Sequence, residues 1–265
     1  MTHGTDPVLS VIIPVWNGER YLAEAITSVL DQKAAPALEV IVIDDGSEDD
    51  SSVVAEQFGP QVRCARVAHG GLAAARNSGI ALARGEYLLH FDADDLLPPE
   101  SIASRMAPFA SPAAPDLVVG QMFSFVSPDL DCETATRYQV PPGPQRGGLS
   151  GATVVRTSFA AKVGELDIRR THGADLDWMV RAMERGARVV EVSEVVLYRR
   201  IHGGNMSLTD GQLAVDRLAT VRAALRRRSA EGRSAGLANP DSLPSPLTYL
   251  EPEDELDRQR AVEGG

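Results

Sequence analysis

Three acidic residues stand within four positions in the segment Asp92-Ala93-Asp94-Asp95. Carboxylates this close repel one another unless they share a cation. Hard divalent ions such as Mg²⁺ take oxygen ligands and usually keep phosphates and waters as their other ligands. A metal bound here would stabilise negative charge on a diphosphate. An acidic turn that ends in a helix N-cap is the alternative, and the segment alone leaves both open.

A second acidic pair, Asp44-Asp45, follows an apolar run and precedes Gly46. Acidic residues at strand ends in nucleotide-binding folds accept hydrogen bonds from a ribose hydroxyl, and a base N–H offers the same kind of donor. An aspartate followed by glycine is also typical of a tight turn. Without the rest of the chain, the pair favours the turn.

Apolar segments alternate with helical patterns through the first hundred residues. We expect strands over 9–14, 39–43, 62–67 and 87–91, and helices over 18–32, 51–58 and 72–83. Gly85 is expected to end the last of these helices as a C-cap. The alternation predicts an α/β fold with a mostly parallel central sheet and helices on both faces. Because ligands bind beyond the carboxyl ends of such strands, we expect Trp16-Asn17, Asp44-Asp45 and residues 92–95 to meet at one site.

The second half of the chain has a less regular pattern. It predicts strands over 118–126 and 188–198, a strand and helix over 151–164, helices over 175–185 and 212–228, and a loop near the site over 128–148. Residues 236–265 form an acidic, Pro-containing tail, which we expect to be loosely ordered.

The composition is that of a globular chain, because 43% of the 265 residues are hydrophobic and 24% are charged. A net charge of −11 argues against a nucleic-acid partner, since binding to a phosphate backbone needs a basic surface. We find no secretory signal and no apolar run near the ~20 residues of a membrane span. Two cysteines without metal-ligand spacing fit a reducing compartment. We therefore expect a cytoplasmic protein.

A basic helix end at Arg226 to Arg228 offers one contact with a membrane surface. Exposure of the same residues to solvent is the plain alternative. A peripheral membrane contact is therefore an expectation that rests on these arginines alone.

Four runs of the sequence resemble, in order and spacing, the motifs of the family 2 glycosyltransferases: SVIIPVWN (10–17), VIDDGS (42–47), AARNSG (74–79) and GEYLLHFDADD (85–95). The resemblance continues more weakly through Ser150 to Arg181, which includes GADLDWMVR (173–181), and through YRRIHGGNMS (198–207). It implies a GT-A fold over 1–235, with a nucleotide-sugar-binding half over about 7–100 and an acceptor-binding half over about 101–235.

The resemblance also implies the chemistry. An inverting enzyme would use Mn²⁺ or Mg²⁺ to move a sugar from a nucleotide-diphosphate sugar, most simply a UDP-sugar, to an acceptor hydroxyl. The processive polysaccharide synthases of the family carry a Gln-x-x-Arg-Trp segment, which this sequence lacks, so we expect transfer of a single sugar. Such an activity would serve glycan, cell-envelope or secondary-metabolite biosynthesis.

By position in these motifs, Asp45 would hold the nucleobase and Arg76 would lie near the nucleotide and its phosphates. Asp92 would approach the ribose and Asp94 would bind the metal, while Asp95 could exchange roles with either. The resemblance places the donor among Pro14, Val15, Trp16, Asn17, Glu19, Asp44, Asp45, Arg76, Asp92, Ala93, Asp94 and His202. It places the metal among Asp94, Asp92, Asp95 and His202. Arg76 as a helix-surface arginine and His202 as a solvated loop histidine are the alternatives for those two residues.

Asp175 occupies the position of the catalytic base. The family opens this helix with an acidic pair, and here Ala174 replaces the first acid. Asp177 is expected on another helix face, because two residues turn a helix by about 200°. A helix-start carboxylate that the helix dipole favours is the alternative for Asp175.

Two other classes of protein compete with a glycosyltransferase. A nucleotidyltransferase would need a Gly-rich, basic phosphate loop after the first strand, and the segment from Trp16 to Arg20 is a poor one. A non-catalytic protein that binds sugar nucleotides is the other, and Ala174 is the feature that favours it.

Overall fold

The computed structural model describes residues 7–138, 140–170, 172–205, 220, 222–224 and 226–227. The chain divides into two compact units, Met1–Ala224 and Leu225–Gly265, and the fold below belongs to the first. The tail at 236–265 and most of the helix expected over 212–228 lie outside the described residues. Among the helices described, none is both long and apolar enough to cross a bilayer.

The first half forms the parallel part of a single sheet. Its strands are β1 (Leu9–Val15), β2 (Leu38–Asp44), β3 (Val62–Arg66) and β4 (Tyr87–His90), which lie in the order β3-β2-β1-β4. The helices between them are α1 (Glu19–Leu30), α2 (Ser51–Glu56) and α3 (Leu72–Leu82), with a 3-10 turn, η1, at Gly59–Gln61. The strands and helices expected in the first hundred residues are confirmed, with ends that differ by a few residues.

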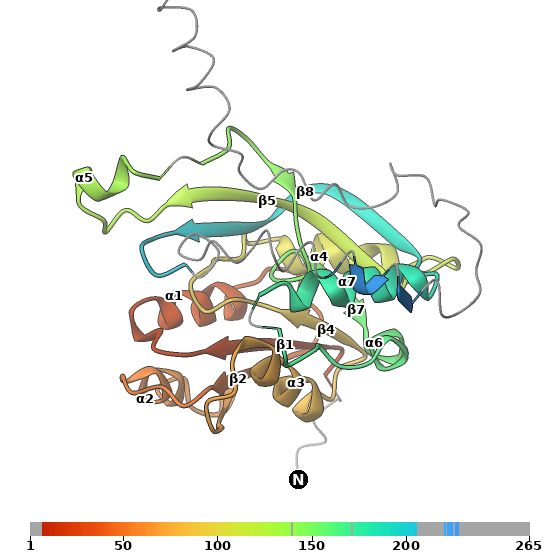
Figure 1. Cartoon of the computed structure of the whole chain (residues 1–265), viewed down its shortest axis with the longest axis horizontal. Helices are drawn as coiled ribbons and strands as arrows, with labels where there is room; N and C mark the ends of the chain where they lie inside the picture. The colour runs from red at the N-terminus through yellow and green to blue at the C-terminus, as the bar shows by residue number, and fades with distance from the viewer. Residues whose placement is uncertain are drawn as a thin grey trace, which may run out of the picture. The chain divides into compact units, whose positions relative to one another are not determined.

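The second half adds strands of mixed direction. The helix α4 (Ser101–Met106) and the 3-10 turn η2 (Ala107–Ala110) lead to β5 (Leu117–Val126), followed by α5 (Cys132–Ala135), β6 (Gln145–Arg146), β7 (Thr153–Arg156), α6 (Thr157–Val163), α7 (Ala174–Glu184) and β8 (Val189–Ile201). Strand β7 runs antiparallel to β4 and to β5, whereas β8 runs parallel to β5, as Figure 1 shows. The sheet is therefore mixed, although the part formed by β3, β2, β1 and β4 is parallel. The segment 128–148, expected to be a loop, contains the short α5 and β6.

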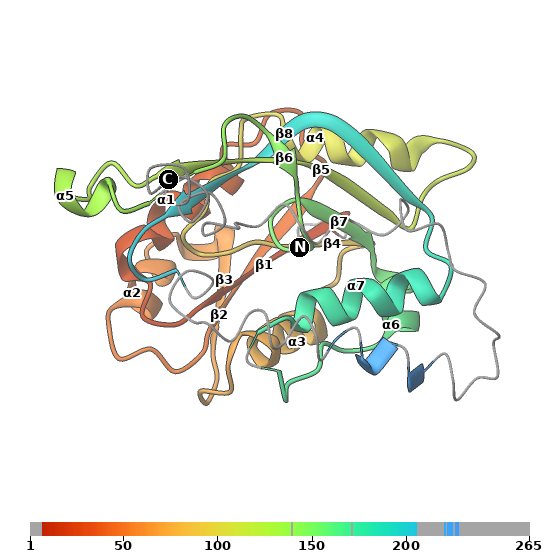
Figure 2. The ribbon, with the colours of Figure 1, turned by 45° about the horizontal axis from the view of Figure 1, so that its top comes forward.

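Helices cover the sheet because its inner strands are apolar on both faces. All seven residues of β1 are buried, although side chains along a strand point alternately to opposite faces. Ile12 packs on one face in a cluster with Phe159 of α6 and Trp178 of α7. Figure 2 shows α6 and α7 beside each other near the β4–β7 part of the sheet. On α1 the buried stripe comprises Tyr21, Leu22, Ala25, Ile26 and Val29.

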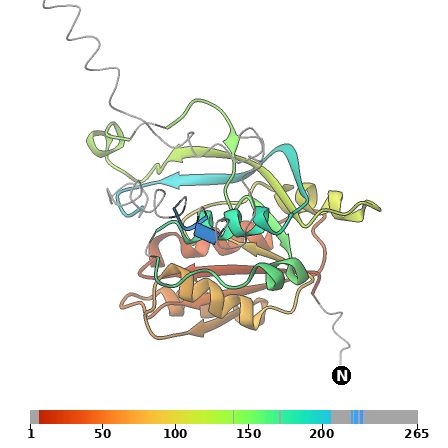
Figure 3. The ribbon, with the colours of Figure 1, turned by 45° about the vertical axis from the view of Figure 1, so that its right-hand side comes forward.

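Helix α3 packs against β1 and β2 (Figure 3), and glycines at two positions, one in the helix and one just after it, allow this part of the chain to lie close to the sheet. A Cβ at Gly79 would lie 2.2 Å from Cγ2 of Ile12, so only glycine allows this separation. Gly85 was expected to be a C-cap, and that prediction is wrong. Ala83 ends the helix in an extended conformation, and Gly85 is instead required because its Cβ would lie 2.5 Å from the backbone nitrogen of Ser10.

Gly79→Ala is expected to lower the free energy of unfolding by about 1–3 kcal/mol, because the added methyl overpacks the contact with Ile12. This loss should appear although alanine raises helix propensity by about 1 kcal/mol over glycine. Ser78→Ala on the same helix is the control and should change stability by less than about 1 kcal/mol. Urea denaturation of both variants provides the measurement, and a Gly79→Ala variant more stable than the wild type would contradict the packing described.

Candidate active site

Asp44 and Asp45 lie at the carboxyl end of β2, both buried. The side chain of Asp44 closes the following turn, because its Oδ1 accepts a hydrogen bond from the Ser47 N–H at 2.8 Å. Asp45 bonds to a different segment: its two carboxylate oxygens accept hydrogen bonds from the N–H groups of Gly70 and Gly71, each at 2.8 Å. Asp45 therefore holds the entry to α3, which begins at the next residue, Leu72.

An exposed aromatic pair stands beside Asp45. The ring of Trp16 stacks on the ring of His69 with centroids 4.8 Å apart, and both side chains are more than half exposed. Nδ1 of His69 lies 3.0 Å from Oδ2 of Asp45. The expected meeting of the first two strand ends is thus confirmed, with His69 as an addition.

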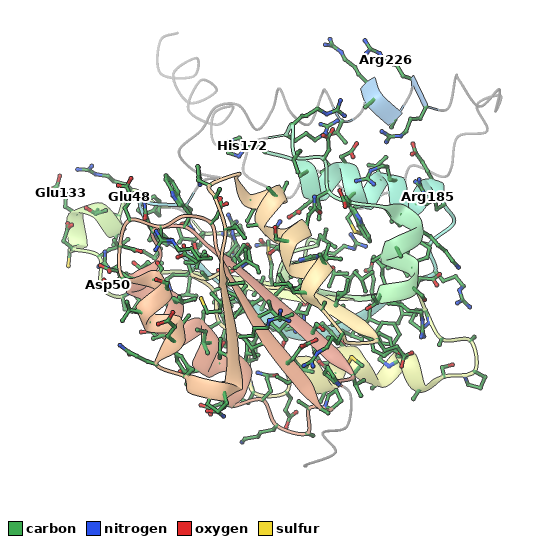
Figure 4. All side chains as sticks on the ribbon, turned by 90° about the horizontal axis from the view of Figure 1, so that it is seen from below. Glu48, Asp50, Glu133, His172, Arg185 and Arg226 are labelled. Carbon is green, nitrogen blue, oxygen red and sulfur yellow. The ribbon has the colours of Figure 1, made fainter. Side chains whose placement is uncertain are left out.

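The other residues expected near the nucleotide surround this pair. Pro14 and Val15 are buried at the end of β1, whereas Asn17 and Glu19 are exposed. Asn17 bridges to the loop after β2, because its N–H donates to Oγ of Ser47 at 3.0 Å. Figure 4 labels Glu48 and Asp50 in that loop, and Glu19 Oε2 accepts a hydrogen bond from the Asp50 N–H.

Arg76 projects from α3 and is buried. The alternative interpretation, an arginine on the helix surface, is therefore wrong. Nη1 donates to both oxygens of Asp175 at 2.6 Å, and Nη2 donates to Oδ1 of Asp92 at 2.6 Å and to Oγ of Ser150 at 2.9 Å. Burial opposes the charge, but the carboxylates of Asp175 and Asp92 raise the pKa of Arg76 above its usual value. The guanidinium is 2% exposed, and the side chains of Asp92 and Asp175 are 36% and 32% exposed, so both acids reach solvent.

A second polar group forms around Asp94, which follows β4. Its Oδ2 lies 3.0 Å from Nε2 of His202 and accepts a hydrogen bond from Nδ2 of Asn205, also at 3.0 Å. The His202 ring is largely buried and lies 4.7 Å from the ring of Tyr21 between centroids. His202 is therefore no solvated loop histidine, and the structure brings it to Asp94 as expected.

The acidic segment 92–95 does not act as one cluster. Asp92 accepts a hydrogen bond from Arg76, and Asp94 contacts His202. Asp95 is buried, and its Oδ1 accepts a hydrogen bond from the backbone N–H of Arg200. Burial and the charges of Asp94 and Asp92 raise the pKa of the Asp95 carboxyl well above its usual range. Ala93 between them is half-buried. Over the part of the chain that the structure describes, no three His, Cys, Asp or Glu side chains are gathered as a ready metal site.

Helix α7 carries Asp175 in its first turn, after Ala174, which is buried in the core. Asp177 points elsewhere, as expected, and pairs with Nε of Arg181 at 2.8 Å. His172 and Arg185, labelled in Figure 4, stand just outside the two ends of this helix. Asp175 thus contacts Arg76 of α3 in the first half of the fold, and Asp177 is a buried residue that pairs with Arg181.

His90, the last residue of β4, is buried under this site, and its Nδ1 has no hydrogen-bond partner within the described residues. Burial, together with the charge of Arg76, lowers the pKa of His90 to about 3. The ring is therefore neutral at neutral pH.

Sequence reasoning missed His69, Ser150, Asn205, Tyr21 and His90. Ser150 and Asn205 lie inside segments that resemble the family, so the signal was present but unassigned. His69 directly precedes the glycines that Asp45 binds, which only the folded chain reveals.

The fold and the comparisons define the class. Over 86% of this chain the fold matches the structure of Staphylococcus aureus TarS (residues 1–349) with UDP-GlcNAc, with a TM-score of 0.69, 20% identity and 67% of that chain covered. It also matches a mannosyltransferase from Pyrobaculum calidifontis in complex with GDP-Man and Mn²⁺, with a TM-score of 0.54, 18% identity, and 87% and 77% of the two chains covered. The chain has the GT-A fold.

Residues 10–161 match the model of glycosyl transferase family 2, and the chain belongs to that family. The glycosyltransferase GlyG of Streptococcus pneumoniae is 33% identical over 126 residues, which is 46% of this chain and 41% of GlyG. The uncharacterized glycosyltransferase EpsJ of Bacillus subtilis is 39% identical over 92 residues, which is 34% of this chain and 26% of EpsJ. The matches thus span less than half of either relative.

The neutral His90 predicts a pH-dependent stability. Its pKa is about 3 in the folded chain, against an ordinary histidine value of 6.5, so below pH 6.5 the unfolded chain takes up a proton that the folded chain does not. Stability is therefore lost as the pH falls, by about 1.4 kcal/mol per pH unit. Between pH 7 and pH 4.5 the wild type should lose about 2–3 kcal/mol more than His90→Leu, measured by urea denaturation. Parallel losses in the two proteins would contradict the burial of a neutral ring.

Proposed function

We propose that this chain moves a single sugar, with inversion, from a nucleotide-diphosphate sugar to an acceptor hydroxyl in glycan, cell-envelope or secondary-metabolite biosynthesis. A UDP-sugar is the proposed donor. One observation carries the proposal: a buried guanidinium, Arg76, holds two partly exposed carboxylates, Asp92 of the nucleotide half and Asp175 of the second half. The site therefore presents a carboxylate on the donor side and another on the side where an acceptor would arrive.

In the proposed reaction Asp175 is the general base. The acceptor oxygen attacks the anomeric carbon while its proton passes to a carboxylate oxygen of Asp175. The bond from the anomeric carbon to the diphosphate breaks, and its electron pair leaves with the nucleoside diphosphate. Positive charge grows at the anomeric carbon, as in glycoside hydrolysis. The two negative charges of Asp92 and Asp175 exceed the one positive charge of Arg76, so the group has a net negative charge that favours this carbon.

The nucleoside would bind at the strand ends of the first half. Trp16 and His69 offer a stacked aromatic surface that is open to solvent. Asp45 lies beside it, and its oxygens retain lone pairs in addition to those that the two backbone N–H groups occupy. These groups fit a base that presents an N–H donor, as uracil does.

Asp94 and His202 fit a divalent cation. Their Oδ2 and Nε2 atoms lie 3.0 Å apart, and such ions are commonly bound by one or two carboxylates while substrate phosphates and waters complete the shell. A bound Mn²⁺ or Mg²⁺ would stabilise the charge of the departing diphosphate. Asp92 and Asp95 do not join the proposed ligand set, because their carboxylates bond to Arg76 and to Arg200 N–H.

The two matched structures support a nucleotide-sugar donor and a divalent cation, since one protein binds UDP-GlcNAc and the other binds GDP-Man with Mn²⁺. Both are below 25% identity, so they support a nucleotide-sugar donor without selecting the sugar. The cytoplasmic location and the peripheral membrane contact stay predictions.

Thermal shift against a panel of nucleotide sugars, with and without Mn²⁺, tests the donor, because a specific ligand raises stability by mass action. The selected donor is then incubated with candidate hydroxyl acceptors, and the products are analysed. Free nucleoside diphosphate with a glycosylated acceptor supports the proposal. Release of pyrophosphate would mean a nucleotidyltransferase, and tight donor binding without turnover of any acceptor would mean a binding protein.

Asp94→Ala is expected to cut kcat by at least about 10²-fold, because a metal would no longer be held where it stabilises the negative charge of the leaving diphosphate. It should weaken donor binding by calorimetry only when Mn²⁺ is present. Glu48→Ala, an exposed carboxylate in the nucleotide half, is the control and should be unaffected. Full wild-type activity in EDTA would rule out the metal.

Asp175→Asn keeps the size of the side chain but cannot accept the proton, so kcat should fall by about 10²–10⁴-fold at nearly unchanged donor affinity. Asp177→Asn is the matched control on the same helix. It should keep kcat and instead lower the free energy of unfolding by about 1–3 kcal/mol, because a buried partner of Arg181 is weakened. Kinetics at saturating donor and urea denaturation measure the two effects. An inactive Asp177→Asn beside an active Asp175→Asn would move the base to Asp177.

A further inference from the structure

The two terminal nitrogens of Arg76, Nη1 and Nη2, donate all their hydrogen bonds to side chains of this protein. Nη1 and Nη2 carry four N–H groups. Two of these donate to Asp175, one to Asp92 and one to Ser150. The remaining N–H, at Nε, is buried and has no partner within the described residues. Arg76 therefore exposes no uncommitted N–H group to a diphosphate in this arrangement, although its motif places it near the phosphates.

The surroundings of Arg76 are rigid. Ser150 precedes Gly151, whose N–H donates to the carbonyl of His90 at 2.5 Å and whose carbonyl accepts from Nη1 of Arg105 at 2.6 Å. Arg105 is itself fully buried. The residue after Ser150 is thus hydrogen-bonded to the end of β4 and to α4, and these bonds fix the backbone beside the hydroxyl that accepts from Arg76.

Among the described residues, two carboxylates are the charged groups that face the Arg76 guanidinium. Arg76 faces Asp92 from the loop after β4, Asp175 from α7, and the neutral ring of His90. A buried guanidinium without carboxylates would be costly, because burial of an unpaired charge costs several kcal/mol. The two acids therefore cannot move away from Arg76 independently without a penalty.

We propose, on the basis of the function above, that Arg76 is the positioning residue of the base: it fixes the Asp175 carboxylate relative to Asp92, so that the group which takes the acceptor proton is aligned with the donor side. Arg76 touches neither the acceptor nor the diphosphate. Its effect on the reaction passes through Asp175, which joins α7 of the second half to α3 of the first.

The kinetic test compares Arg76→Met with Arg76→Lys. Arg76→Met should lower kcat by about 10²-fold while the KM for the donor changes less than about threefold, because misplacement of a reacting group by about 1 Å costs that much. The acidic limb of its kcat profile should move to higher pH, since a cation beside the base is lost. Arg76→Lys restores the charge without the planar fork, so it should return the acidic limb and recover only part of kcat.

The control is Arg84→Met, two residues beyond the end of α3, the helix that carries Arg76. Arg84 forms an exposed ion pair with Glu39, and its loss should leave kcat, KM and the pH profile unchanged. A fall in donor affinity with unchanged kcat in Arg76→Met would overturn the proposal and return Arg76 to the diphosphate. A lowered kcat with an unmoved acidic limb would overturn it as well.

A double-mutant cycle on unfolding provides a readout that does not need activity. The variants Arg76→Met, Asp175→Asn and their combination are unfolded in urea, and the double variant should lose less stability than the sum of the single losses. Additive losses would contradict the inference whatever the enzyme does. If the cycle shows coupling while the wild type transfers no sugar from any donor, the proposed function fails and the fixed geometry of Asp175 stands.

Discussion

A single buried cation, the guanidinium of Arg76, sets the geometry on which the site depends. Asp92 and Asp175 neutralise its charge, and these two acids come from different halves of the fold. Helix α3 can carry the arginine to this depth because Gly79 lets the helix touch Ile12 of β1. The close packing of one helix and the placement of two carboxylates are therefore parts of the same constraint.

The strand ends at which we propose that the nucleotide binds are connected to the same helix. Asp45 binds the N–H groups of Gly70 and Gly71, which lead into α3, and it stands beside the exposed ring pair of Trp16 and His69. A continuous set of contacts thus runs from the strand ends, through the start of α3, to Arg76 one turn later and to Asp175. Residues that would bind the base and the residue that would accept a proton are held by one framework.

The sequence predicted the strands and helices of the first half well, because apolar runs and helical stripes report burial directly. It failed where one residue type serves two purposes: Gly85 looked like a helix cap, but it permits close approach to the Ser10 backbone. It also could not separate Asp92, Asp94 and Asp95, since adjacent carboxylates reveal nothing of the partners that turn them apart. The pairing of Arg76 with Asp175 spans 99 residues, and only the fold brings the two together.

The most direct test of this account is a crystal structure of the chain with Mn²⁺ and a non-transferable analogue of its nucleotide-sugar donor. We expect the base of the nucleotide beside Asp45 and Trp16, the cation on Asp94 and His202, and the anomeric carbon facing a carboxylate of Asp175 that is still bonded to Arg76. A structure in which the diphosphate binds Arg76 directly, with Asp175 turned away from the anomeric carbon, would contradict it.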